Sequence, residues 1–71
     1  MVVVGGLYRH YKNKDYRVIA IAKHSETLED MVVYQALHGE REIWVRPLAM
    51  FEERIFLNGG AVPRFCLLSD N

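Results

Sequence analysis

The sequence predicts a small, mostly-β domain: a bent sheet or small barrel of five to six strands with one short helix. Short runs rich in β-branched and aromatic residues alternate with turn residues along the chain. Asn58-Gly59 is a strong hairpin signal, because a tight hairpin turn needs positive φ at both central residues. In 71 residues a flat sheet could not cover its own apolar face, whereas bending or closing the sheet does so and also removes exposed edges.

Four extended segments are expected in the first half of the chain. They are Met1–Val4 (an edge strand or a frayed end), Leu7–Tyr11, Tyr16–Ala22 and Met31–Leu37. Asparagine and aspartate in residues 12–15 favour a turn, which predicts a hairpin between the second and third segments. The polar stretch from Lys23 to Asp30 is expected to be a loop, with a single helical turn as the alternative.

The second half of the chain is expected to hold a strand, the helix and a last hairpin. A turn at His38–Arg41 leads into a strand at Glu42–Arg46. Pro47 ends this strand, because proline has no backbone N–H to donate to a neighbouring strand. Proline is also favoured at the start of a helix, which is predicted to end near Arg54. The last hairpin pairs Ile55–Leu57 with Ala61–Leu68, and residues 69–71 form a frayed tail.

Composition indicates one domain, residues 1–71, in a reducing compartment. Cys66 is the only cysteine, so no disulfide within the chain can support the thin core of so small a domain. The amino-terminal residues lack the charged start and apolar run of a signal peptide, and no segment approaches the roughly 20 apolar residues of a membrane span. A cytoplasmic location, with no membrane partner, is therefore expected.

Several motifs together resemble one bacterial family that is known only as domain of unknown function 1653 (DUF1653). They are GLYRHYKNKDYRV, AKHSET, VVY, WVRPLAMF and VPRF, and they extend the resemblance from Gly6 to about Leu68. Asn13 departs from the glycine expected there, but asparagine tolerates the same backbone. The resemblance implies a compact stand-alone domain, similar in outline to SH3-like barrels, and it implies no activity.

A polar-aromatic face is the leading candidate for a binding site. Side chains alternate between the two faces of a strand. Tyr34, Trp44 and Arg46 would therefore be neighbours if Met31–Leu37 pairs with Glu42–Arg46 and those faces align. Tyr8, His10 and His24 could border them. Tyrosine, tryptophan and arginine are enriched at binding hot spots. The sequence therefore predicts a non-enzymatic module for a small ligand, peptide or partner protein. The alternative is that both aromatic residues belong to the core.

Catalytic and metal-binding interpretations are weaker, and no catalytic residue, metal ligand or cofactor is predicted. The run His24-Ser25-Glu26-Thr27 offers a base and hydroxyls, but such loops usually hold themselves together by side-chain to backbone bonds. The three histidines match no zinc motif in spacing. Cys66 lies in an apolar run and is expected to be a small buried hydrophobe.

Nucleic-acid binding is the second functional hypothesis. The net charge is zero, but the charge is unevenly distributed. Residues 1–24 hold five basic residues and one acidic residue (+4), and residues 25–71 hold four basic and eight acidic residues (−4). The stretch YRHYKNKDYR interleaves basic residues with aromatic residues, as proteins that bind single-stranded nucleic acids do. Arg9, Lys12, Lys14 and Arg17 would then lie on one exposed face of the amino-terminal hairpin. An enzyme is the third hypothesis.

Overall fold

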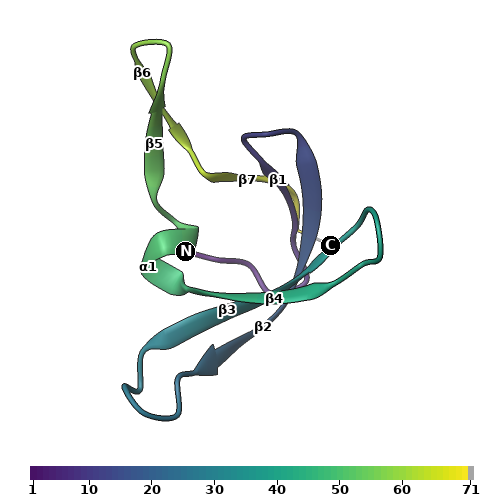
Figure 1. Ribbon diagram of the computed structural model, residues 1–71, viewed down its shortest axis with the longest axis vertical. Coiled ribbons are helices and arrows are strands. Elements are labelled where there is room, and N and C mark those ends of the chain that lie inside the picture. Colours follow the sequence, from purple (N-terminus) through teal and green to yellow (C-terminus); the bar gives the residue numbers. More distant parts are fainter. Residues whose placement is uncertain (71) are drawn as a thin grey trace.

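The computed structural model describes residues 1–70, and it is an open, bent sheet with one helix and one projecting hairpin (Figure 1). The elements are β1 (Leu7–His10), β2 (Lys14–Lys23), β3 (Asp30–Ala36), β4 (Ile43–Pro47), α1 (Leu48–Phe51), β5 (Arg54–Leu57), β6 (Gly60–Pro63) and β7 (Phe65–Ser69). Five strands form an antiparallel sheet in the order β4-β3-β2-β1-β7, and β5 and β6 form a separate two-stranded sheet. The predicted mostly-β class is confirmed, with a bent sheet in place of a closed barrel.

The amino-terminal hairpin forms as predicted, with Tyr8 opposite Tyr16 in the register of β1 and β2. Asn13 adopts a φ of 66° in the connecting turn, which asparagine tolerates. Residues 1–4 form no strand. The segment is instead held by a bond from the Val3 N–H to the Tyr8 hydroxyl at 2.9 Å.

The helix is a single turn, shorter than predicted. Pro47 ends β4 with φ −54° and ψ 139°, and α1 closes with the Glu52 N–H donating to the Leu48 carbonyl at 3.0 Å. Arg54, where the helix was expected to end, already starts β5 and lies opposite Pro63. No helix within residues 1–70 has the length and apolarity needed to cross a membrane.

The predicted last strand, Ala61–Leu68, is in fact two strands, which gives seven strands within residues 1–70. β6 belongs to the projecting hairpin, whereas β7 pairs with β1 in the main sheet, so the chain must turn between them at Arg64. The Arg64 backbone is fixed at this corner, donating to Glu53 and accepting from Tyr11. The hairpin turn itself is as predicted, with positive φ at Asn58 (52°) and Gly59 (81°). Of the predicted frayed tail, Ser69 belongs to β7, and residue 71 lies outside the described part of the chain.

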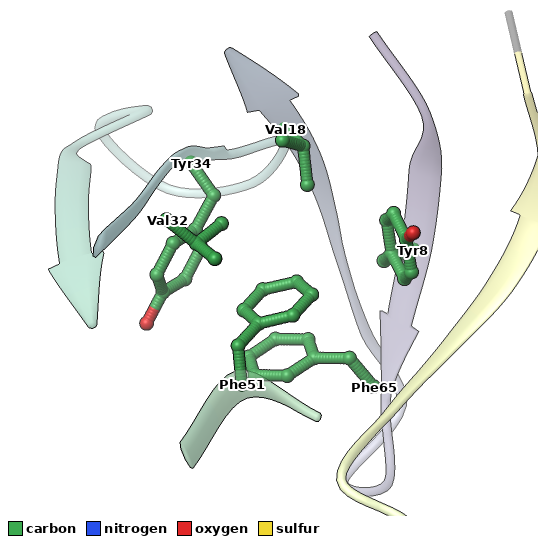
Figure 2. Packing of buried hydrophobic residues seen from close by; sticks show 6 residues of the cluster. All are labelled: Tyr8, Val18, Val32, Tyr34, Phe51 and Phe65. Carbon is green, nitrogen blue, oxygen red and sulfur yellow. The ribbon is translucent and has the colours of Figure 1, made fainter. Parts of the chain in front are cut away.

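The core is a stack of aromatic rings enclosed by the concave face of the sheet and by α1 (Figure 2). Phe51 from α1 lies flat on Phe65 from β7, with ring centroids 4.1 Å apart and planes within 4°. Tyr8 and Tyr34 each meet Phe51 edge-on, at 5.3 and 5.4 Å. The other fully buried side chains of the cluster are Val18 and Val32. Burying each such side chain stabilises the fold by about 1.5–3 kcal/mol, so this small cluster is the main source of stability.

Candidate functional site

The pairing of β3 with β4 brings the predicted polar-aromatic residues together. Tyr34 lies opposite Trp44, and Val32 lies opposite Arg46, so all four side chains share one face of the sheet. Their exposure differs: Tyr34 is 5% exposed and Trp44 is 49% exposed. The Tyr34 hydroxyl accepts a hydrogen bond from Arg46 Nε at 3.3 Å, and this is the contact that joins Tyr34 to the exposed part of the face. Trp44 and Arg46 therefore form the accessible part of this group, and Tyr34 belongs to the core.

Arg46 is held above an aromatic ring. Its guanidinium carbon lies 5.8 Å from the centroid of Phe65, within cation–π range. Two other arginines pair with carboxylates: Arg9 lies 2.8 Å from Asp15, and Arg64 lies 2.6 Å from Glu53. Within residues 1–70, Arg46 forms no ion pair. It is a half-buried cation, held by the Tyr34 hydroxyl and the Phe65 ring.

His10 lies at the end of β1, near the same aromatic cluster. Its ring meets Phe65 edge-on at 4.9 Å, and its Nδ1 accepts a bond from the Lys12 N–H at 3.2 Å. Burial lowers the pKa of His10 below its ordinary value of 6.5, and the positive charges of Arg46, Arg64 and Lys12 lower it further. The neutral imidazole is therefore the form that the fold favours.

The lowered pKa of His10 predicts a loss of stability on mild acidification. The unfolded chain takes up this proton near pH 6.5, whereas the folded chain takes it up only at a lower pH, so the free energy of unfolding should fall as the pH drops below 6.5. Replacing His10 with phenylalanine keeps an aromatic ring against Phe65 and should flatten this dependence. Urea denaturation between pH 7.5 and pH 5 measures it. An imidazole that titrates by NMR at or above its ordinary pKa would contradict the prediction.

Tyr8 and His24, which the sequence placed at the border of the site, have structural contacts elsewhere. Tyr8 is buried, with its hydroxyl bonded to Val3. His24 lies in the loop between β2 and β3, where its Nδ1 accepts from the N–H groups of Glu26 (3.2 Å) and Thr27 (3.3 Å). The loop is thus held by side-chain to backbone bonds, as the sequence indicated.

The four basic residues of the nucleic-acid hypothesis do not share one face. Arg9 and Arg17 lie on the convex face, where Arg9 binds the Asp15 carboxylate through two bonds and Arg17 donates to the Gly5 carbonyl at 3.0 Å. Lys14 lies opposite His10 on the other face, and Lys12 lies in the turn, over the ring of Tyr11. Nucleic-acid binding stays a prediction without a feature of the structure that favours it.

The remaining candidates are dispersed. His10, His24 and His38 come from a strand end and two separate turns, and no group of three metal-ligating side chains occurs within residues 1–70. The expectation that Cys66 is buried is wrong: it is exposed. Alternation along β7 directs Phe65 into the core and Cys66 outward, opposite Arg9.

The feature that sequence analysis missed is the free edge of β4. Hydrogen-bonded and non-bonded pairs alternate along an antiparallel ladder, and the Ala36 N–H donates to the Glu42 carbonyl at 2.9 Å, which sets the alternation here. The backbone N–H and C=O groups of Ile43 and Val45 therefore point away from β3. Pro47 has the same orientation but carries no N–H. A proline within a strand is typical of an edge strand, and Pro47 was therefore the available signal.

The opposite edge of the sheet is less regular. Leu7 pairs with Ser69 and Tyr8 with Leu67, so Leu68 is an extra residue that forms a bulge in β7. Bulges twist an edge and interrupt pairing. Of the two edges, β4 is the one that presents an uninterrupted ladder.

Two open, largely apolar grooves lie away from this edge. Their volumes are about 300 and 340 Å³, and both are lined by Pro63 and Cys66. One lies beside Phe51 and the amino-terminal residues, and the other lies between the β1–β2 turn and the β5–β6 hairpin. Neither is lined by Trp44 or Arg46.

Comparison with known proteins places the chain in a family. No curated protein matches it. A crystal structure of a DUF1653 protein from Bordetella bronchiseptica is similar, with 33% sequence identity and a TM-score of 0.83 over 92% of this chain and 86% of that chain. Residues 6–67 match the family described as protein of unknown function (DUF1653), which agrees with the extent expected from the sequence motifs. The chain therefore belongs to the DUF1653 family.

Proposed function

We propose that this domain is a non-enzymatic binding module that takes an extended segment of a partner protein as an added strand along β4. The observation that carries the proposal is the regular, apolar edge at Ile43, Trp44 and Val45, whose side chains are 61%, 49% and 59% exposed. Soluble domains usually protect an edge with charges, a bulge or proline. β7 has its bulge, whereas β4 has none, and its one charged residue, Arg46, and its proline, Pro47, both stand at the end of the strand. Edges of this kind accept peptide strands in several domain families.

The side chains of β4 define which segment would fit. In an added antiparallel strand, directly opposed side chains share a face. An acidic residue would face Arg46 and an aromatic residue would face Trp44 on the concave side, while apolar residues would face Ile43 and Val45 on the other side. Each well-matched pair contributes about 0.2–1 kcal/mol, and the backbone bonds add affinity with little dependence on sequence.

A protein segment is favoured over a small ligand for this site. Trp44 and Arg46 stand on an edge strand, and neither lines the two grooves described above. Small-molecule sites are usually concave and enclose most of the ligand surface. An exposed strand edge offers instead a row of backbone donors and acceptors, which an extended chain can satisfy.

The test is a titration of dilute, ¹⁵N-labelled protein with a blocked Glu-Val-Phe-Val-Lys peptide. We expect saturable shifts centred on the amides of Ile43 and Val45, with a Kd on the order of 100 µM, equivalent to about −5.5 kcal/mol. The amides of β7 should not move.

Replacing Val45 with proline is the matched control. The Val45 N–H points to the free edge, so proline should leave the β3 ladder intact and weaken peptide binding by roughly tenfold or more. Shifts that are absent at millimolar peptide, or that map to β7 and persist in the proline variant, would refute strand addition at β4.

A further inference from the structure

We infer that the strand added to β4 is β4 of a second copy of this chain, with a two-fold axis at Trp44. This inference rests on the proposed function, because it names the partner of the same edge. The pairing would join two five-stranded sheets side by side. In Figure 1, β4 runs from its turn with β3 to α1.

The sequence of this edge is complementary to itself. Residues 42–46 read Glu-Ile-Trp-Val-Arg. When a second copy pairs in antiparallel fashion about Trp44, Glu42 lies opposite Arg46, Ile43 lies opposite Val45, and the two Trp44 residues lie opposite each other. A two-fold dimer needs such a self-complementary patch. Each opposed pair is of a favourable type: opposite charges, β-branched side chains, or aromatic rings.

The backbone supports the same register. The outward-facing groups of β4 belong to Ile43 and Val45, and this register places them opposite each other in two pairs that would exchange about four hydrogen bonds in all. Trp44 directs its own backbone groups toward β3, so the Trp44 pair is a non-bonded pair. In such a pair the side chains approach most closely, with Cα atoms about 4.5 Å apart. Pro47 falls just beyond this ladder, where its missing N–H matters least.

Charge complementarity favours a second copy as the occupant. Neither Arg46 nor Glu42 has an ion-pair partner within residues 1–70, although Asp15, Asp30 and Glu53 pair with other cations. The dimer would hold two Glu42–Arg46 pairs, one on each side of the axis, so each of these residues would face one opposite charge. The net charge of the chain is zero, so two copies do not repel each other over long range. The contact is one short strand on each side, which is typical of a weak dimer with a micromolar Kd.

Sedimentation equilibrium over a concentration series tests the inference. The wild-type chain should show a reversible monomer–dimer equilibrium. The E42R variant places arginine opposite Arg46 of the second copy and should raise the dimer Kd by roughly tenfold. Exchanging both charges, E42R with R46E, should restore the dimer. E40R makes the same charge change just outside the paired segment and should leave the dimer Kd unchanged.

The single tryptophan gives a second readout. Emission from Trp44 should shift to the blue as the dimer forms, and circular dichroism should show coupling between the two indoles. The V45P variant should be folded and monomeric. A wild-type chain that is monomeric at all concentrations, or a dimer insensitive to both E42R and V45P, overturns the inference.

The peptide titration separates the two proposals. A monomer that still binds the blocked peptide at Ile43 and Val45 would remove the dimer and leave strand addition in place. A monomer that does not bind the peptide would remove both.

Discussion

Replacing Phe51 with alanine should remove a large part of the free energy of unfolding of this domain. Phe51 is 1% exposed, stacks on Phe65 at 4.1 Å and meets Tyr8 and Tyr34 edge-on. Truncating a buried phenylalanine costs about 3–5 kcal/mol. A chain of this length has a total stability of only about 4–10 kcal/mol, so the loss is a large fraction of it. Urea denaturation followed by far-UV circular dichroism measures the change.

The matched control for Phe51 is Phe56, on the projecting β5–β6 hairpin. Its side chain is 83% exposed, so the same substitution there should change the free energy of unfolding by no more than about 0.5 kcal/mol. Equal losses in the two variants would show that the ring stack does not dominate the stability of this domain.

Replacing Gly6 with alanine should lower the melting temperature by about 5–20 °C. A Cβ atom at Gly6 would stand 2.9 Å from the Val3 carbonyl oxygen and 3.1 Å from both Leu67 Cδ1 and Tyr8 Cε1. Such crowding costs about 1–3 kcal/mol, which corresponds to that temperature shift in a domain of this size. The backbone cannot move freely to relieve it, because the Gly6 carbonyl accepts from the Val18 N–H at 3.0 Å. Differential scanning calorimetry measures the midpoint.

Gly60 provides the matched control for Gly6. Its φ is not positive, and the nearest atom to an added Cβ, the Leu57 carbonyl oxygen, is 3.8 Å away. The same substitution at Gly60 should therefore leave the midpoint within a few degrees of the wild type. A Gly6 variant as stable as the Gly60 variant would mean that the amino-terminal segment shifts without cost.

Local signals predicted most strands and turns correctly. The β-branched runs became β2 and β3, Asn13 and Asn58 adopted the left-handed backbone that their turns require, and Pro47 ended its strand. These features depend on backbone sterics and on hydrogen bonds between residues close in sequence, so the sequence contains the information they need.

The division of the last strand was missed for a reason that lies outside the local sequence. Nothing in residues 61–68 shows that Pro63 pairs with β5 whereas Phe65 pairs into the main sheet. The turn at Arg64 exists because β7 pairs with β1, which lies more than fifty residues earlier in the chain.

The same distinction applies to the candidate site. Alternation placed Tyr34, Trp44 and Arg46 on one face, and the ladder between β3 and β4 has that register. Alternation could not show that α1 folds back to cover Tyr34 with Phe51 and leaves Trp44 in solvent. Both faces of β3 carry apolar residues, so the position of α1 decides which of them becomes the core.

By itself, the sequence determined the mostly-β class, the order of the hairpins and the faces that side chains share, because these follow from backbone geometry with a period of two residues. The tertiary structure alone decided which face is buried and which strand is left at an edge. Those outcomes depend on contacts between segments distant in the chain: α1 closing over the rings, and β7 pairing with β1, which leaves β4 as the regular free edge.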